Sequence, residues 1–160
     1  MNSTPRIDTL KEKHLIGIRM KMSLSNNRTG ELWKEFMQLR NSNMKVKRSE
    51  LYSIQVYPLN YFNSFSLENE FEKWAAVKVV DSQNLMPFFY SFILPAGLYA
   101  VFNYKGINTD HSIFKYIYSE WIPNSEYMLD HRPHFEILGE KYKNNDPNSE
   151  EEIWIPIKDK

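Results

Sequence analysis

The sequence predicts an α+β fold in which two helices pack against one side of an antiparallel β-sheet. Several short segments alternate apolar and polar residues, as half-buried strands do, and two longer segments carry apolar residues at helical spacing. The order strand, helix and roughly three strands occurs twice, starting near His14 and near Leu98. A chain of 160 residues is long enough for one domain built from two such halves.

The first half contains one predicted helix at residues 31–40. Leu32, Phe36 and Leu39 form an apolar stripe along it, and Thr29 is a candidate N-cap. Its predicted strands cover residues 14–22, 51–57, 71–80 and 88–94.

The second half repeats this order. Ile113, Ile117 and Trp121 recur every four residues in a predicted helix at residues 110–121, which Pro123 is expected to end. The strands predicted here cover residues 98–104, 127–129, 134–140 and 152–157. Direct identity between the halves is slight, so the half-repeats, at about 14–94 and 97–158, are inferred from the order of elements.

Composition excludes several kinds of function. The chain has no cysteine and a net charge of zero, so disulfides, thiol nucleophiles and a basic nucleic-acid-binding surface are not expected. The start of the chain carries no signal peptide, and the longest apolar stretch, residues 86–102, is broken by Pro95 and Gly97. We therefore expect a soluble cytoplasmic protein that needs no membrane.

Neither a cofactor nor a metal ion is predicted. Five glycines in all make a phosphate-cradling loop improbable. His131 and His134 have an H-x-x-H spacing, but Arg132 and Pro133 between them indicate a turn, in which the two rings need not converge.

The predicted strand at His134 carries a carboxylate among apolar residues. Alternation places Phe135 and Ile137 on one face and Glu136 on the other. An exposed sheet face would solvate Glu136, whereas a buried one would require it to be paired, protonated or used. Trp154 lies on the more polar face of the last strand and would share a concave surface with Glu136 if the two strands were neighbours.

Four segments in the second half resemble one protein family. They are GLYAVFNYKG at residues 97–106, EWIPNSEY at 120–127, RPHFEIL at 132–138 and EEIWIPIK at 151–158. Together they resemble the GyrI-like small-molecule-binding domain, which is also the effector-binding domain of AraC- and MerR-type regulators such as Rob and BmrR. The resemblance implies a single domain over residues 1–160, made of a duplicated β-α-β-β-β unit of the SHS2 type with a cleft between pseudo-symmetric halves.

The resemblance also implies a ligand site in this cleft. In the regulators a glutamate on the F-E strand anchors lipophilic, often cationic aromatic compounds between aromatic rings, and this role falls on Glu136 and Trp154 here. Core packing is the alternative for each further tryptophan candidate, and a hydrogen bond to a backbone group is the alternative for each tyrosine candidate. These candidates are Trp33, Trp74, Trp121, Tyr104 and Tyr127.

The resemblance leaves three functions open and does not decide whether the chain is an enzyme. The first is binding of a hydrophobic, aromatic small molecule, either neutral or cationic, for sequestration or sensing of a toxic compound in a bacterium. The second is hydrolysis of strained electrophilic natural products, with Glu136 as general base and Tyr104 or Tyr127 as proton donor. The third is protein–protein inhibition of the DNA gyrase inhibitor kind. A chain of this length leaves no room for a helix-turn-helix domain, so we expect a stand-alone module with no direct contact to nucleic acid.

Overall fold

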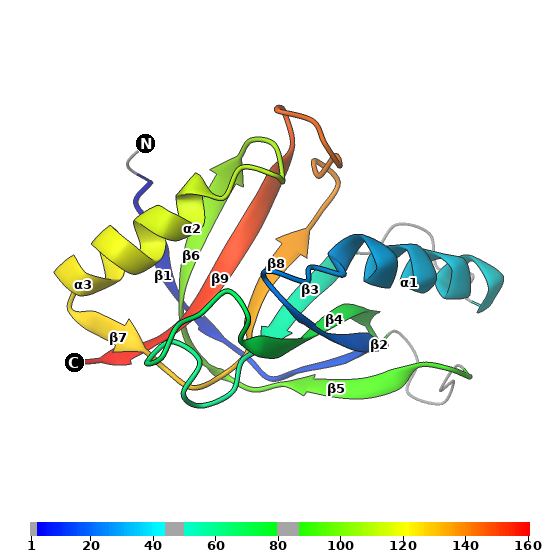
Figure 1. Cartoon of the computed structure of the whole chain (residues 1–160), viewed down its shortest axis with the longest axis horizontal. Coiled ribbons are helices and arrows are strands. Elements are labelled where there is room, and N and C mark those ends of the chain that lie inside the picture. Colours follow the sequence, from blue (N-terminus) through cyan, green and yellow to red (C-terminus); the bar gives the residue numbers. More distant parts are fainter. Residues whose placement is uncertain (1–2, 44–49, 80–86) are drawn as a thin grey trace.

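The computed structural model of the chain describes residues 3–43, 50–79 and 87–160. It is an α+β fold with a nine-stranded, antiparallel sheet and two helical segments, as the sequence predicts (Figure 1). The strands are β1 (Arg6–Leu10), β2 (Lys13–Ser23), β3 (Leu51–Val56), β4 (Glu70–Lys78), β5 (Tyr90–Leu94), β6 (Gly97–Lys105), β7 (Tyr127–Leu129), β8 (His134–Leu138) and β9 (Glu150–Asp159).

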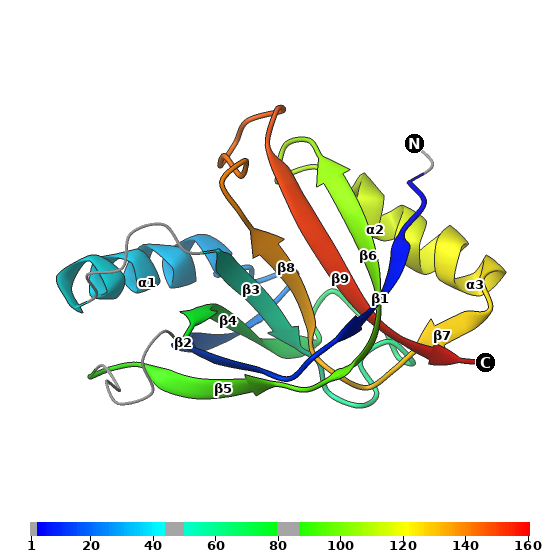
Figure 2. The same cartoon turned by 180° about the vertical axis from the view of Figure 1, so that it is seen from behind.

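The order of the strands in the sheet is nearly symmetric about its centre, in that strands at equal distances from the centre play matching parts. It runs β1-β6-β9-β8-β3-β4-β2-β5, so the central pair, β8 and β3, brings together one strand from each part of the chain. Each outer strand crosses over: β1 pairs with β6, and β5 pairs with β2 (Figure 2). Strand β1, from the start of the chain, therefore extends the end of the sheet that the second half builds, whereas β5 and β2 at the other end both come from the first half.

The two helical segments cover different strands and leave the centre of the sheet between them (Figure 1). The first, α1 (Thr29–Asn43), buries Leu32 and Phe36 against side chains of β2 and β4. The second runs through α2 (Ser112–Tyr116), the π-helical η1 (Ile117–Trp121) and α3 (Ile122–Asn124), and packs against β6 and β9. No helix in the described part of the chain is long and apolar enough to cross a membrane.

Several boundaries differ from those predicted. Strand β1 was not foreseen, because RIDTL contains only two large apolar residues and pairs only with the distant β6. Pro123 does not end the helix at residue 121, since the helix continues to Asn124. The preceding π-helical turn, closed by a hydrogen bond from the Ile122 N–H to the Ile117 carbonyl, widens the backbone where the proline ring would otherwise clash.

Smaller differences concern α1 and the strand predicted at residues 71–80. Thr29 is the first residue of α1 and not its cap; its backbone N–H donates to Asn27 Oδ1 at 3.0 Å. The last residue of the predicted strand, Val80, lies outside the described residues.

Register assigns each side chain of the central strands to one of two faces, because directly paired residues point the same way. On the face away from the helices, Trp74, Ile54, Phe135 and Trp154 form a row across β4, β3, β8 and β9. These side chains lie in one buried cluster with Tyr52 and Tyr99 of the same face. The Phe135 and Trp154 rings stack at 5.2 Å.

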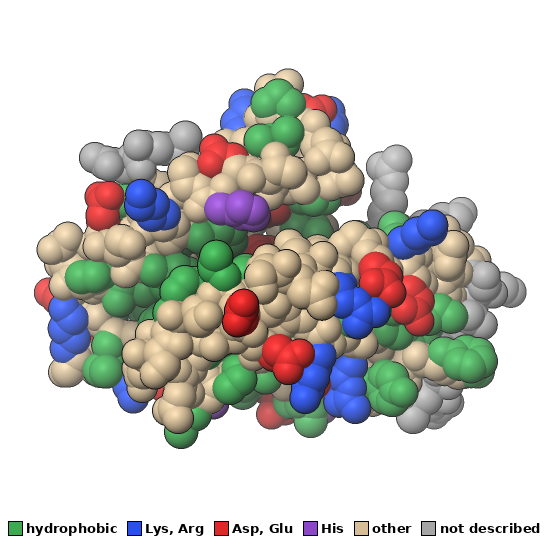
Figure 3. Space-filling view, in the orientation of Figure 1, with side chains coloured by type: hydrophobic (Ala, Val, Ile, Leu, Met, Phe, Trp, Pro, Cys, Tyr) green, Lys and Arg blue, Asp and Glu red, His purple; other side chains and the backbone are tan. Residues whose placement is uncertain are grey.

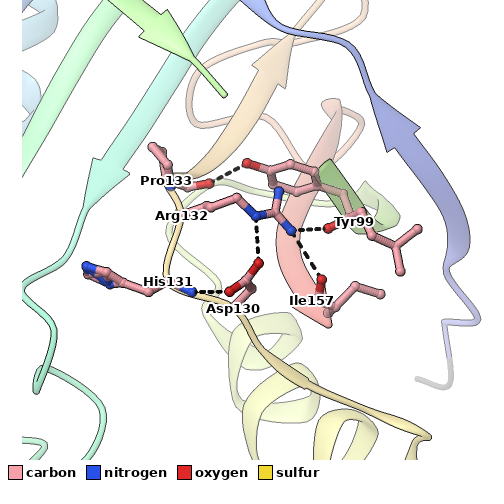
Figure 4. Close-up of polar contacts among 7 residues, drawn as sticks. Tyr99, Asp130, His131, Arg132, Pro133 and Ile157 are labelled. Carbon is pink, nitrogen blue, oxygen red and sulfur yellow. Dashed lines mark hydrogen bonds and ion pairs between the residues drawn. The ribbon is translucent and has the colours of Figure 1, made fainter. Parts of the chain in front are cut away.

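An arginine fixes the start of β8 (Figure 4). Arg132 Nε donates to Asp130 Oδ2 at 2.9 Å, and Nη2 donates to the carbonyl oxygens of Leu98 at 2.6 Å and Ile157 at 3.1 Å. Its guanidinium carbon also lies 4.7 Å from the centre of the Tyr99 ring. The arginine thereby joins the segment before β8 to both β6 and β9.

We expect Arg132→Lys to lower the free energy of unfolding by about 2–3 kcal/mol, because lysine keeps the charge but loses the planar fork that holds three acceptors. Urea unfolding would measure this loss. The matched control is Arg28→Lys, which alters an exposed pair with Glu31 that also has two hydrogen bonds, at 2.9 and 2.8 Å. The control should cost less than about 1 kcal/mol, and equal losses in the two variants would contradict the assigned role.

Candidate ligand-binding site

Glu136 lies at the centre of the sheet, on the face that carries the helices. It pairs with Ser53 of β3 and Ile153 of β9, and Ile153 packs with Ile113 of α2 and Ile117 of η1. The carboxylate is partly buried, and among the described residues its one hydrogen bond comes from Gln55 Nε2, at 3.5 Å. In the described part of the chain no cation lies within 4.0 Å of it.

Three further polar residues of the same face surround Glu136. Lys73 on β4 and His134 on β8 both pair with Gln55, and Glu151 lies on β9 two positions from Ile153. Lys73 and Glu151 are partly buried, while Gln55 is buried. We call Gln55, Lys73, Glu136 and Glu151 the central polar site.

The charges of this site act on one another. Burial raises the pKa of Glu136, and the nearby Lys73 and the Gln55 hydrogen bond only partly oppose this shift. Burial and the Glu136 charge together raise the pKa of Glu151 to about 8. Burial lowers the pKa of Lys73, although both glutamates favour its charged form. Near neutral pH the Glu151 carboxyl group is therefore largely protonated, and the pKa values of Glu136 and Lys73 are both shifted in the direction that favours the uncharged form.

Aromatic side chains border the site at its His134 end. The buried His134 ring stacks on Phe62 at 5.5 Å and meets the edge of Tyr57 at 4.9 Å. The Tyr118 hydroxyl and His134 Nδ1 are hydrogen-bonded at 3.0 Å. Burial lowers the pKa of His134 to about 3, so its ring is neutral at physiological pH. Rings from the β3–β4 loop and from η1 therefore form an apolar wall beside the polar site.

The charge of Glu136 also affects the pKa values of three tyrosine hydroxyls. Burial first, and then the Glu136 charge among others, raise the pKa of Tyr57, Tyr118 and Tyr142. All three phenols remain protonated at neutral pH, and the Tyr118 hydroxyl is already hydrogen-bonded to His134 Nδ1.

The surface is hollowed between the second helical segment and the rest of the molecule, and acidic atoms are visible in the depth of this hollow (Figure 3). Two surface depressions lie elsewhere. One, of about 310 Å³, is lined by Tyr116, Glu120, Trp121, Asn124 and Ser125, and the other, of about 610 Å³, by residues 9–14 with Lys78 and Val79. We favour the central polar site because its charged side chains are partly buried on one face of the sheet, at the junction of β3 and β8.

The expected pairing of Glu136 with Trp154 is wrong. Their strands are neighbours, but the register places Trp154 opposite Phe135, so the indole and the carboxylate lie on opposite faces of the sheet. Trp154 Nε1 donates to Glu152 Oε1 at 3.2 Å, and the Arg6 guanidinium lies 5.5 Å from its ring centre.

Trp74 follows the same plan on β4. It shares the face of Trp154, donates to Glu72 Oε1 at 2.7 Å and has the Arg19 guanidinium 5.7 Å from its ring centre. Trp74 therefore lies on the face of the sheet opposite to Glu136, and a ligand role for it stays a prediction. Both indoles belong to a Glu-x-Trp unit whose polar and aromatic contacts are internal.

The remaining aromatic candidates make contacts with the two helical segments or with their own loops. Trp33 meets Phe36 edge-on at 5.5 Å within the α1 cluster, and Trp121 stacks on Tyr127 at 6.3 Å within the α2 cluster. The buried Tyr104 hydroxyl donates to the Ile107 carbonyl at 2.9 Å, which leaves it poorly placed to donate to a ligand. A ligand role for Trp33, Trp121 and Tyr127 stays a prediction.

The two histidines of the H-x-x-H spacing differ in their exposure to solvent. His134 is buried against Tyr118, while His131 is exposed. Among the described residues, no three His, Cys, Asp or Glu side chains are grouped so that they could hold a metal ion.

The alternation of residues along each strand could have revealed two charged residues that the sequence analysis missed. Lys73 alternates in phase with the apolar Phe71 and Ala75, and Glu151 with Ile153 and Ile155. A charged residue in the buried phase is the same anomaly that marks Glu136. Tyr57, Tyr118 and Tyr142 carried no comparable signal, because two lie in or beside loops and one on a helix.

A family model described as the GyrI-like small molecule binding domain matches residues 3–158. The chain belongs to this family. None of the curated proteins compared with it matches. Solved structures of GyrI-like fold resemble it over almost its whole length.

Three of these structures illustrate the likeness in fold. SAV2435, solved with bound tetraphenylphosphonium, is 17% identical, with a TM-score of 0.66 and coverage of 99% of this chain and 94% of its own. The EcmrR C-terminal domain is 11% identical, with a TM-score of 0.71 and full coverage of both chains. A hydrolase from Listeria innocua is 9% identical, with a TM-score of 0.63 and coverage of 97% and 92%. At these identities the likeness shows the fold alone.

Removing the Glu151 charge should stabilise this GyrI-like domain at high pH. The folded protein raises the pKa of Glu151 to about 8 from an ordinary 4.5 and so holds this proton more tightly than the unfolded chain does. Stability is therefore lost as pH rises from about 5 to about 8. We expect Glu151→Gln to raise Tm relative to wild type, by more at about pH 8.5 than at about pH 5, as measured by thermal unfolding.

The control is Glu150→Gln, whose side chain is 45% exposed on the neighbouring position. It should leave the pH dependence of Tm unchanged. A constant difference between Glu151→Gln and wild type at every pH would show that Glu151 titrates normally.

Proposed function

We propose that this chain binds a lipophilic organic cation over the central polar site, with Glu136 as the counter-charge. The observation that carries this proposal is the carboxylate itself. It is partly buried at the junction of the two halves, accepts one long hydrogen bond, and has no cation within 4.0 Å in the described residues. Desolvating such a group is costly, and a bound cation would offset the cost.

The neighbouring rings favour an aromatic ligand. Tyr57, Phe62 and Tyr118 provide apolar surface and ring faces that attract organic cations. The tetraphenylphosphonium bound by SAV2435 combines four phenyl rings with one delocalised positive charge, and this chemistry fits a carboxylate beside an aromatic wall. Sequestration or sensing of a toxic compound would be the use of such binding.

We expect Glu136→Gln to weaken tetraphenylphosphonium binding about tenfold or more, a loss of about 1.4 kcal/mol, because the amide keeps the shape but removes the counter-charge. Calorimetric titration would measure the dissociation constants. Tetraphenylborate, of nearly the same shape and opposite charge, should bind wild type weakly and gain affinity in the variant. The matched control is Glu140→Gln, an exposed glutamate just beyond β8, which should bind as wild type does. Equal affinity of all three proteins for tetraphenylphosphonium would remove Glu136 from the site.

Hydrolysis is a second candidate, favoured by the pair of glutamates. Two neighbouring carboxyl groups can serve as a base and an acid at one pH when one is ionised and the other protonated, and the pKa of Glu151 is raised to about 8 by burial and by the Glu136 charge. Glu136 would take a proton from water as the water attacks a strained three-membered ring, and protonated Glu151 would give its proton to the departing ring atom, so that one water is added overall. The Listeria innocua neighbour is described as a hydrolase.

Styrene oxide is a simple probe for this second function. A hydrolase should convert it to the diol faster than buffer does, and both Glu136→Gln and Glu151→Gln should lower kcat by about a hundredfold, the scale of general acid–base catalysis. Chromatography of the diol would follow the reaction. A rate that equals the uncatalysed rate would leave binding as the function.

A further inference from the structure

Lys73 is an unexpected member of a site that would hold a cation. It lies on β4 in the middle of the sheet, pairs with Gln55 and points to the face that carries Glu136. Its side chain is partly buried, yet in the described chain it makes no hydrogen bond and has no carboxylate within 4.0 Å. Strand spacing places its Cα about 12 Å from that of Glu136, across β3. Two side chains of this length can span that distance, but Gln55 lies between them and donates to Glu136 instead.

Elsewhere in the molecule a comparable cation is paired. The Arg132 side chain is 14% exposed and has a carboxylate at 2.9 Å as well as two carbonyl acceptors. Partly buried charges are normally matched in this way, because each loses hydration on burial. Lys73, Glu136 and Glu151 all lack such a partner among the described residues, so partners for charges of both signs are missing at one place.

The charge of the site supports the same conclusion. The site combines one basic side chain, Lys73, with two acidic ones, Glu136 and Glu151, and burial together with the Glu136 charge raises the pKa of Glu151 to about 8, so that this carboxyl group is largely protonated near pH 7. A simple cation would satisfy Glu136 but would add its charge to that of Lys73. A molecule with separated positive and negative groups would satisfy both.

We propose that the ligand is an aromatic zwitterion, whose cationic part lies at Glu136 and whose carboxylate or similar anionic group lies at Lys73. This inference rests on the proposed binding function and narrows its ligand class. Lys73 is then the residue that selects zwitterions over simple lipophilic cations.

Rhodamine B and its ethyl ester test this directly. The two dyes share one cationic ring system, and only rhodamine B carries a free carboxylate at about pH 7. Fluorescence anisotropy should show that wild type binds rhodamine B about tenfold tighter than the ester, which corresponds to about 1.4 kcal/mol. Lys73→Met should abolish or reverse this preference, because it removes the anion partner and one opposing positive charge. Lys73→Gln provides a second variant should the methionine variant unfold.

The matched control is Lys78→Met, an exposed lysine on the same strand, which should keep the wild-type preference. Glu136→Gln should weaken both dyes. If the dyes bind with equal affinity to wild type and both still depend on Glu136, the zwitterion inference fails and the proposed cation site stands. If Lys73→Met tightens both dyes equally, Lys73 only balances the glutamates, and the inference also fails. Absence of binding by either dye and by tetraphenylphosphonium would overturn both proposals.

Discussion

The pairing of β3 with β8 is the constraint on which the rest of the structure depends. It joins the two parts of the chain, and its register, with Ser53 opposite Glu136, decides what each face of the sheet presents. A slip of one residue would send Phe135 and Ile137 toward the helices and place the carboxylate among the tryptophans. Arg132 holds β8 in this register from its first residue, because its fork binds backbone carbonyls on β6 and β9 at once.

This register gives the two faces different tasks. The face away from the helices is closed: its aromatic row is buried, and its indole N–H groups are used by Glu72 and Glu152. The helix face is closed at its two ends by α1 and α2, while its centre carries the partly buried charges. Three large apolar clusters stabilise the sheet, and this stabilisation offsets the cost of burying the charged groups of the central polar site. Strained or desolvated groups of this kind commonly mark functional sites.

The sequence was sufficient for the elements that depend on local pattern. Both helices, most strands and the anomaly at Glu136 follow from spacing alone, and the family resemblance supplied the overall fold. The sequence did not predict which face of the sheet Trp154 lies on. A tryptophan with a glutamate two residues away looks like part of a polar face until the register between β8 and β9 is known. Strand β1 was missed for a similar reason, since its partner lies about ninety residues away. Lys73 and Glu151 were within reach, because each breaks the apolar phase of its own strand.

The aromatic part of the site also lies on a different face of the sheet from the one that carries Trp74 and Trp154. Trp74 and Trp154 occupy matching positions in the sheet, each with a glutamate accepting its N–H and an arginine over its ring, so the two halves use the same device for the closed face. Rings for a ligand must then come from the helix face, where Tyr57, Phe62 and Tyr118 meet around a neutral His134. Tyr57 and Phe62 lie in the loop between β3 and β4, and Tyr118 lies on the π-helical turn η1. A ligand bound there would therefore contact both parts of the chain. Binding at the central polar site would thereby reinforce the same junction of β3 and β8 that creates it.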